Sequence, residues 1–204
     1  MTDADTGGEP ADGAVPTKAA LRRTIRAARR AAPTDEGRAD RVAAAVLANP
    51  EVARRLAGPG ASVATYVSLP WEPPTGVLRQ RLRALGVRVV LPVADPNGGL
   101  TWVVDDGTAG AAWGVPGQPP SPPAPATAAQ SGEATAVVVV PALAATSDGR
   151  RLGQGGGYYD RFLADLPAAA TGGPLLAAVV GPDELLDDLP TEPHDRRVDV
   201  VIIA

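Results

Sequence analysis

The sequence has no cysteine, a single histidine and only 3% aromatic residues, and each shortage excludes some chemistry. Without cysteine there is no disulfide framework, thiolate nucleophile or cysteine zinc cluster. One histidine, His194, excludes a metal site built on a histidine pair. The first 16 residues have neither the basic start nor the apolar core of a secretory signal, and no apolar run approaches the ~20 residues of a membrane span. We therefore expect a cytoplasmic protein without a membrane partner.

Charge is spread unevenly along the chain. The net charge of -4 argues against general nucleic-acid binding. Residues 18–41 nevertheless contain many basic side chains and only three acids. A local basic face of this kind can bind a discrete anion although the whole chain is acidic.

Length and composition indicate one globular domain. A chain of 204 residues with 45% hydrophobic content can bury one sizeable core. Residues 1–16 are acidic and rich in glycine and proline, so we predict a disordered lead before a domain at 17–204. Residues 105–133 are rich in proline, alanine, glycine and serine, which predicts a long surface loop.

Helical periodicity begins after Thr17, a plausible N-cap. The residues expected to face inward on this first helix, with the arginines facing solvent, are Leu21, Ile25, Ala28 and Ala32. A second helix is predicted at 35–57, a shorter one at 77–85, and another beginning near Tyr158.

Short β-branched runs alternate with these helices. They predict strands at 61–68, 87–93, 137–140, 175–180 and 198–203, with a further antiparallel strand at 100–104. This alternation is typical of an α/β domain with a mostly parallel sheet flanked by helices, a Rossmann-like three-layer sandwich. In such sheets ligands bind beyond the carboxyl ends of the strands, which selects the loops 69–75, 142–157 and 190–195.

The densest motif is DGRRLGQGGGYYD, at residues 148–160. Its glycines let backbone N–H groups approach an anion, and Arg150 and Arg151 add charged donors at the start of a helix. No Lys-Ser or Lys-Thr pair follows, so this is not a Walker A loop. A flexible glycine turn is the ordinary alternative, but the strand-loop-helix context favours phosphate binding.

Most of the few aromatic side chains lie in or beside the three loops. They are Tyr66, Trp71, Trp113, Tyr158, Tyr159 and Phe162. Each ring alone could be core packing, but their clustering favours stacking on a flat heteroaromatic ligand.

Four further sites each have a functional and an ordinary interpretation. Lys18 and Arg22 share a helical face that could bind phosphate, or could simply be solvated. Three carboxylates could hold Mg²⁺ or merely cap local structure: Asp160, Asp195 and Asp199. Glu72 lies in a rigid setting before two prolines, where it could accept hydrogen bonds from a ligand or could simply be an exposed loop acid. His194 is most simply a structural histidine.

Four separated segments, taken together and in this order, resemble the 5-formyltetrahydrofolate cyclo-ligase family. The third is the most specific. They are KAALRRTIRAARRA from residue 18, YVSLPWEPPT from 66, VVVPALAATSDGRRLGQGGGYYDRFL from 138, and LPTEPHDRRVDVVI from 189. The resemblance implies an ATP-dependent enzyme that closes 5-formyltetrahydrofolate, with or without a polyglutamate tail, to 5,10-methenyltetrahydrofolate, as a monomer or homodimer.

The same resemblance implies roles for individual residues. The ATP-binding set is Lys18, Arg22, Gly149, Arg150, Arg151, Leu152, Gly153, Gln154, Gly155, Gly156 and Gly157. The folate-binding set is Val67, Glu72, Trp113, Leu152, Gly153, Gln154, Gly155, Gly156 and Tyr158. The catalytic residues are Arg151, Glu72 and Tyr158, and the Mg²⁺ ligands are Asp160 and Asp195.

The chain departs from the family pattern at a few positions. Family members commonly have Phe-Asp where this chain has Ala145-Thr146, often an acid at Pro74, and frequently basic residues at Gln154 and Gly156. One alternative is therefore a cyclo-ligase-like protein that binds folate or nucleotide with impaired turnover. A weaker alternative is a sugar-phosphate isomerase or acyl-CoA-transferase-like enzyme on a similar sheet, which would act without ATP.

Overall fold

A computed structural model describes residues 16–32, 34–94, 99–107 and 135–204. The predicted N-terminal lead, Trp113 and most of the predicted 105–133 loop lie outside these residues. No helix within the described part of the chain is long and apolar enough to cross a membrane.

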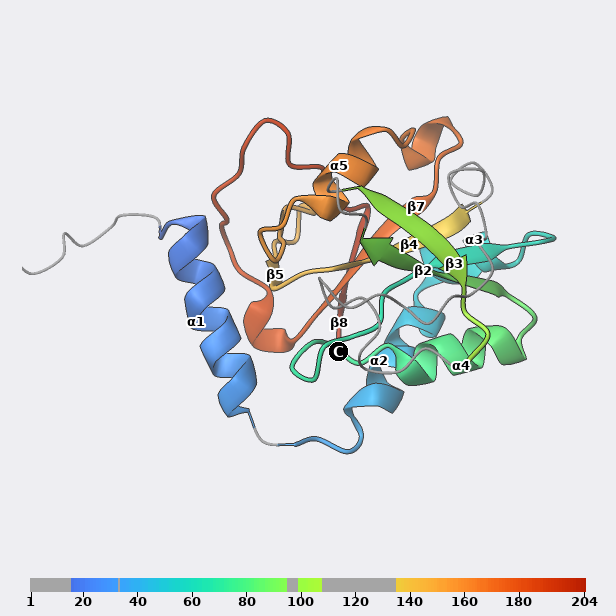
Figure 1. The fold of residues 1–204 in the computed structure, drawn as a ribbon, viewed down its shortest axis with the longest axis horizontal. Coiled ribbons are helices and arrows are strands. Elements are labelled where there is room, and N and C mark those ends of the chain that lie inside the picture. Colours follow the sequence, from blue (N-terminus) through green and yellow to red (C-terminus); the bar gives the residue numbers. More distant parts are fainter. Residues whose placement is uncertain (1–15, 33, 95–98, 108–134) are drawn as a thin grey trace, which may run out of the picture.

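The centre of the fold is a six-stranded sheet with strand order β3-β2-β1-β4-β7-β8 (Figure 1). Every pairing is parallel except that of β2 with β3, as predicted. Its strands are β1 (Ser62–Ala64), β2 (Arg88–Ala94), β3 (Leu100–Val104), β4 (Thr135–Pro141), β7 (Leu175–Val180) and β8 (Val200–Ile203). The chain passes from β1 outward to β2 and later returns to β4 on the other side of β1, so loops diverge where β1 and β4 end.

Helices cover both faces of the sheet, which confirms the three-layer arrangement. Side chains alternate along β4, so that Val137 and Val139 pack against α2 (Arg38–Ala48), α3 (Pro50–Leu56) and α4 (Gly76–Ala84). Val138 and Val140 belong to a second core with Leu163 of α5 (Tyr158–Ala164). Two 3₁₀ turns, Ala169–Thr171 and Pro182–Glu184, complete the described helical elements.

The prediction of a single helix at 35–57 is wrong, because the chain forms two helices there, α2 and α3, which meet at Asn49. The Asn49 side chain accepts hydrogen bonds from the N–H groups of Glu51 and Val52, which makes it the N-cap of α3. Pro50 follows at the first helical position, where its missing N–H costs nothing. The first strand is also shorter than the predicted 61–68, since the chain leaves the sheet after Thr65.

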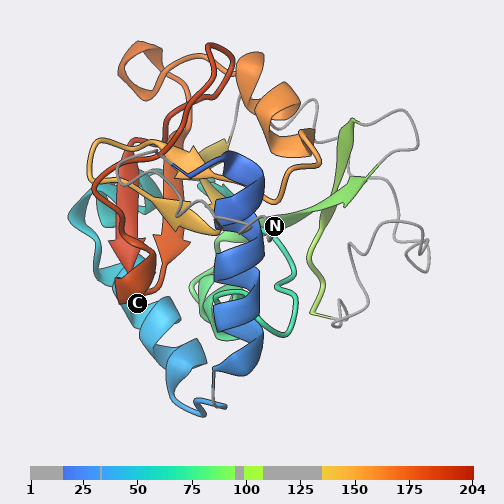
Figure 2. The same cartoon turned by 90° about the vertical axis from the view of Figure 1, so that its left-hand side faces the viewer.

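The first helix, α1 (Lys18–Ala31), is capped by the Thr17 hydroxyl, as predicted. It lies across one side of the domain (Figure 2), against a small hairpin of β5 (Ala144–Ala145) and β6 (Arg151–Leu152). The predicted orientation is only half right: Leu21 and Ile25 pack inward, but Ala28 and Ala32 are exposed. The inward face instead carries basic side chains, because polar groups of the hairpin and of later loops bind them.

The start of the predicted 105–133 surface loop is buried. Asp105 is only 3% exposed and accepts hydrogen bonds from Arg79 at 2.9 Å and Arg83 at 2.5 Å. These two arginines belong to α4, so this carboxylate fastens the end of β3 to the helical layer. At Asp105 the surface-loop prediction is therefore wrong.

Candidate active site

The three loops selected from the sequence form two neighbouring cavities. The first, here called the α1 cavity, has a volume of about 600 Å³, and its walls include Lys18, Arg22, Gly155, Gly157, Asp160 and Asp195. The second, here called the Glu72 cavity, has a volume of about 230 Å³, and its walls include Tyr66, Val67, Leu69, Glu72, Gln154 and Tyr158. The glycine loop contributes Gly155 and Gly157 to the first and Gln154 to the second, so it borders both cavities.

The glycine loop, residues 149–157, begins inside the β5–β6 hairpin, which the sequence did not predict. Gly149 turns this hairpin at φ +85°, and a Cβ there would lie 2.2 Å from the Val198 carbonyl oxygen. The Val198 N–H in turn donates to the Gly149 carbonyl at 2.9 Å. Close packing against the C-terminal segment therefore explains this glycine, and no phosphate contact is needed to account for it.

Glycines later in the loop face the α1 cavity. Gly155 has φ +94° and Gly157 has φ +69°, both in the left-handed region that favours glycine. Gly157 is the residue before α5, so the chain turns sharply from the loop into this helix. A Cβ at Gly155 would approach the Arg22 guanidinium to 3.3 Å, which leaves α1 and the loop directly opposed.

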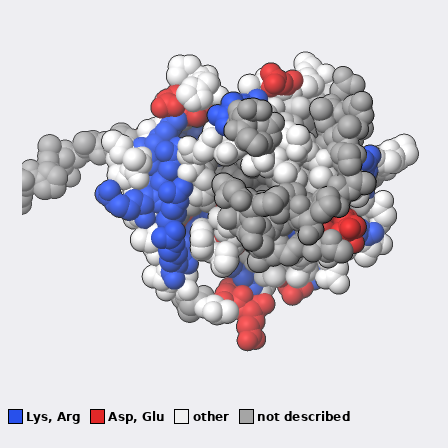
Figure 3. All heavy atoms as spheres, in the orientation of Figure 1, with Lys and Arg blue, Asp and Glu red and all other residues white. Residues whose placement is uncertain are grey.

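Basic side chains of α1 line one wall of this cavity and gather along the helix (Figure 3). The Lys18 ammonium contacts Asp195 at 2.6 Å and Glu192 at 3.2 Å, and Arg22 donates to the Gly153 carbonyl at 2.9 Å. Burial alone would lower the pKa of Lys18, but the hydrogen bonds to the two carboxylates outweigh it and raise that pKa. Lys18 is therefore fully charged at neutral pH.

Glu72 is the buried carboxylate of the second cavity, with 6% of its surface exposed. Its Oε2 accepts a hydrogen bond from the Leu69 N–H at 2.9 Å, and its Oε1 accepts one from the Gln154 amide at 2.7 Å. The interpretation of Glu72 as an exposed loop acid is therefore wrong. A buried carboxylate stabilised by N–H donors remains an acceptor that suits the N–H groups of a heteroaromatic ligand.

The aromatic clustering is only partly a feature of this cavity. Tyr66, Tyr158 and Tyr159 line it together. Burial raises the pKa of Tyr66 and of Tyr159, so neither hydroxyl ionises near neutral pH. Trp71 instead packs under the Arg30 guanidinium, 4.9 Å from its ring centroid, and Phe162 packs on Trp102.

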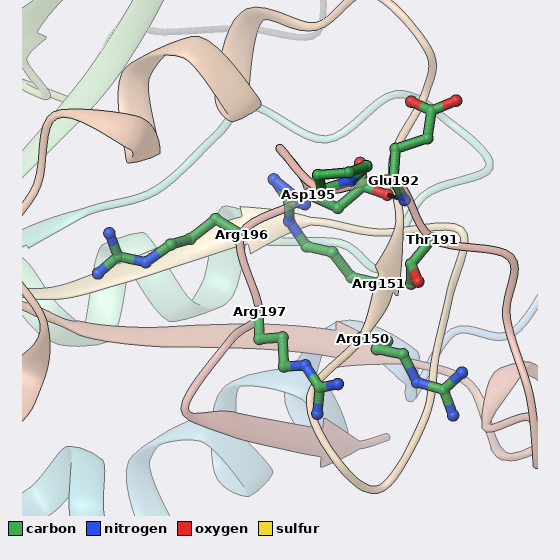
Figure 4. Close-up of a pocket in the computed structure, with 8 residues that line it drawn as sticks. Arg150, Arg151, Thr191, Glu192, Asp195, Arg196 and Arg197 are labelled. Carbon is green, nitrogen blue, oxygen red and sulfur yellow. Dashed lines mark hydrogen bonds between the residues drawn. The ribbon is translucent and has the colours of Figure 1, made fainter.

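Arg151 lies behind the α1 cavity rather than in its wall. Its side chain is 3% exposed and donates to Asp160 at 2.6 Å. It lines a third cavity of about 220 Å³, where its guanidinium lies toward Asp195 while those of Arg150 and Arg197 point the other way (Figure 4). Its Nε is buried with no hydrogen-bond partner among the described residues, so the guanidinium keeps an unused donor.

Arg150 does not reach the α1 cavity in this structure. Its guanidinium forms ion pairs with Asp148 and Asp188 and donates to the Leu189 carbonyl at 3.1 Å. The hydrogen bonds to these two aspartates raise the pKa of Arg150, and the hydrogen bonds from Thr146 and Arg150 lower the pKa of Asp148 to about 2. This cluster has the character of a surface ion-pair network.

The predicted metal ligands Asp160 and Asp195 both line the α1 cavity. Asp160 uses Oδ1 for Arg151, and Asp195 uses Oδ2 for Lys18 and the Glu192 N–H. Burial alone would raise the pKa of Asp195, but the Lys18 hydrogen bond outweighs it and lowers that pKa. Both carboxylates therefore fit the oxygen donors that Mg²⁺ prefers beside phosphates.

Asp199, the third acidic candidate, has a structural partner instead. Its Oδ2 accepts from the Leu176 N–H at 2.8 Å, just before β8. The sequence analysis did not group Glu192 with His194 and Asp195. In the structure the ligand atoms of these three residues lie within 4.8 Å of one another. Their spacing in the chain could have signalled it.

Arg26 is a further residue that the sequence analysis did not single out. It continues the i, i+4 series of Lys18 and Arg22 by one turn, which is the signal that could have identified it. Its guanidinium binds Gln154 of the glycine loop through both the side-chain and the backbone oxygen.

Comparison with known proteins gives a consistent result. The family model described as the 5-formyltetrahydrofolate cyclo-ligase family matches residues 14–204. A 5-formyltetrahydrofolate cyclo-ligase from Mycolicibacterium smegmatis is 40% identical over 142 residues, which are 67% of this chain and 70% of that protein. The mouse protein of the same name is 32% identical over 66 residues, 32% of each chain.

Two solved structures share the fold. A 5,10-methenyltetrahydrofolate synthetase from Mycoplasma pneumoniae superposes with a TM-score of 0.65 at 20% identity, covering 91% of this chain and 97% of that one. The enzyme of the same name from Aquifex aeolicus gives a TM-score of 0.67 at 22% identity, covering 91% and 89%. At these identities the structures support the architecture alone.

Proposed function

The chain belongs to the 5-formyltetrahydrofolate cyclo-ligase family, and from this premise we propose how its residues close 5-formyltetrahydrofolate to 5,10-methenyltetrahydrofolate with ATP. The products are ADP and phosphate. The observation that carries the assignment of residues is the placement of one glycine loop between the basic α1 cavity and the Glu72 cavity. Two substrates that must react with each other then bind on adjacent sides of a single loop.

The reaction needs ATP because the N5-formyl oxygen is a poor leaving group. Transfer of the γ-phosphoryl group to this oxygen forms a P–O bond and breaks the bond to ADP. N10 then attacks the activated carbon, and phosphate leaves with the oxygen. The protein has to position the reactants and neutralise developing negative charge, so the absence of a cysteine nucleophile is no obstacle.

The ATP phosphates are assigned to the α1 cavity. Lys18 and Arg22 supply charge from the helix, and the backbone of Gly155 and Gly157 leaves room for close approach. Lys18 would exchange its partner Asp195 for a phosphate oxygen. Arg151, held by Asp160 behind the wall of this cavity, would add positive charge to the site without contacting the transferred group directly.

Mg²⁺ fits this site through Asp160 and Asp195, which line the same cavity as Lys18 and Arg22. When bound there, the ion would neutralise phosphate charge and favour transfer to the formyl oxygen. Among the described residues no hydrogen bond occupies the second oxygen of either carboxylate, which supports the fit.

The pterin is assigned to the Glu72 cavity. Glu72 would accept hydrogen bonds from its N–H groups, and Tyr66, Val67 and Tyr158 offer apolar surface to the ring. The folate contact of Trp113 stays a prediction of the sequence, since this residue lies outside the described part of the chain. A monomeric or dimeric state, binding of polyglutamate tails, a cytoplasmic location and a boundary near residue 17 remain predictions of the sequence.

The impaired-binder alternative is not favoured, because the matched relatives are named as the enzyme. Two departures from the family pattern also have local explanations. Thr146 is buried and its hydroxyl donates to Asp148, and Gln154 binds Glu72 directly. These residues are integrated into the loop and do not disrupt it.

The assay is absorbance of methenyltetrahydrofolate formed from 5-formyltetrahydrofolate, ATP and Mg²⁺, with ADP measured in parallel. We expect one ADP for each product and no reaction without ATP. Folded protein that forms no product would refute the enzyme. Turnover that continues without ATP would instead support an isomerase-like or transferase-like activity.

A further inference from the structure

Arg26 links α1 to Gln154 in the wall of the Glu72 cavity, although it lines neither cavity among the described residues. Its Nη2 lies 2.5 Å from the Gln154 carbonyl oxygen and 3.0 Å from Gln154 Oε1, and its Nε lies 3.1 Å from the same Oε1. One side chain of α1 thus makes three hydrogen bonds to one residue of the glycine loop.

These contacts fix which way the Gln154 amide points. A glutamine amide has an acceptor end and a donor end, and rotation by a half turn exchanges them. Arg26 can only donate, so the Gln154 oxygen must face Arg26 and the amide nitrogen must face Glu72, where it donates at 2.7 Å. With the amide reversed, two donors would meet at Arg26 and two acceptors at Glu72.

From this geometry we propose that Arg26 is a positioning residue for the folate substrate, acting through Gln154 on Glu72. The Glu72 carboxylate has two hydrogen-bond donors among the described residues, the Leu69 N–H and the Gln154 amide. A buried carboxylate needs such donors to satisfy its oxygens and to hold them in place. Arg26 therefore controls the acceptor that faces the Glu72 cavity, although it touches no substrate.

The placement of Arg26 on α1 also matters. Arg22, one turn earlier, donates to the Gly153 carbonyl, so adjacent turns of the helix hold adjacent residues of the loop. The inference rests on the proposed function, because it takes the Glu72 cavity as the folate side. It adds that a basic side chain from α1 orients the loop at Gln154, a position where the loop itself carries no charge.

The test is a double-mutant cycle on Arg26 and Gln154. R26A and Q154A should each raise the KM for 5-formyltetrahydrofolate about tenfold, the scale of one hydrogen bond to a charged group. The KM for ATP should stay within about twofold in both variants, because Gln154, although predicted to bind both ligands, lines the Glu72 cavity and not the α1 cavity. Both variants break the same chain of hydrogen bonds. The double variant R26A/Q154A should therefore raise the KM for 5-formyltetrahydrofolate about tenfold, and not about a hundredfold.

Two further variants separate positioning from simple helix docking. R26K keeps the charge but loses the fork of donors, so its folate KM should lie between those of wild type and R26A. R23A removes an exposed arginine of the same helix that has no hydrogen bond or ion pair among the described residues, and both KM values should stay unchanged. If R26A fails to fold, the cycle is run with R26K, and the question is again whether the two effects on the folate KM multiply.

Three outcomes would overturn the proposal: an unchanged folate KM in R26A, effects that multiply in the double variant, or equal rises in both KM values with reduced thermal stability. The cycle is repeated with calorimetric binding of 5-formyltetrahydrofolate in the absence of ATP. If wild type binds folate but forms no product, the proposed function fails while the positioning of Glu72 by Arg26 is still decided by the binding cycle.

Discussion

The two ends of α1 carry the same kind of side chain toward the same side of the helix, yet they serve different purposes. Lys18, near the start, is 17% exposed and contacts Asp195 and Glu192 at the edge of the α1 cavity. Arg29, near the end, is 3% exposed and holds Glu184 through two hydrogen bonds of 2.5 and 2.7 Å. The exposure of the cation itself, and not that of its partner Asp195 or Glu184, separates a cation available to a ligand from one that fastens the fold.

The Arg29 contact reaches three parts of the chain. Arg29 also donates to the Ala142 carbonyl at 2.8 Å, at the end of β4, while Glu184 accepts from the Gly181 N–H at 2.7 Å, at the end of β7. The second half of α1 is therefore tied to the ends of two central strands. These contacts fasten to the sheet the same helix that carries Arg22 and Arg26 to the glycine loop.

The largest expected effect is on stability at the buried end. Glu184→Ala leaves Arg29 buried without its carboxylate, which should lower the free energy of unfolding by about 3–5 kcal/mol in urea titrations. Asp35→Ala, which breaks the exposed ion pair with Arg41, is the matched control and should leave the unfolding midpoint nearly unchanged. Equal effects of the two substitutions would contradict the distinction between the ends of α1.

The next effect is on nucleotide binding at the open end. Arg22→Ala should raise the KM for ATP roughly ten- to a hundredfold, because it removes a charged donor from the α1 cavity. Its unfolding midpoint should change far less than that of Glu184→Ala. Arg23→Ala on the exposed side of α1 serves as control, and an equally large rise in its ATP KM would refute a specific role for Arg22.

The smallest expected effect is a dependence on pH. Burial alone would raise the pKa of Glu184, but the Arg29 and Gly181 hydrogen bonds outweigh it and lower that pKa below its ordinary 4.5. Its stabilising contribution is therefore complete above pH 4.5 and is lost as pH falls through the lowered pKa.

Unfolding of wild type and Glu184→Gln should be compared from pH 7 to pH 3. The difference in stability should be constant down to about pH 4.5 and then shrink. Asp195 also has a lowered pKa, but it is present in both proteins and cancels in the comparison. A difference that widens in acid would show that the sign of the linkage is wrong.

Local patterns were sufficient to predict much of the fold. The alternation of β-branched runs with helical periodicity predicted the parallel sheet, and the reversed pairing of residues 100–104 was also anticipated. Thr17 was correctly predicted as a cap, because its signal lies within one turn of the helix. The break at Asn49 and Pro50 was equally local and could have been identified from the Asn-Pro pair.

Features that depend on distant partners could not be predicted in this way. Arg29 looked like any other arginine of α1, because its partner Glu184 lies 155 residues further along the chain. Asp105 looked like the beginning of a polar loop until α4 supplied Arg79 and Arg83. In both cases a charged residue is buried because of its ion pairs, and single-residue polarity predicts the opposite.

The candidate site shows the same division. The glycine spacing and the interval between Lys18 and Arg22 are local patterns. They predicted correctly that α1 and the glycine loop line one cavity. The hairpin that packs Gly149 against Val198 depends on the C-terminal segment, so its glycine could not be distinguished in advance from one that serves a ligand.

The most direct measurement is a crystal structure with ADP, Mg²⁺ and 5-formyltetrahydrofolate bound together. The placement of the glycine loop between two cavities predicts phosphates against Lys18, Arg22 and Gly155, and a pterin hydrogen-bonded to Glu72 on the opposite side of the loop. Both ligands on one side of the loop, or phosphates bound away from α1, would contradict it.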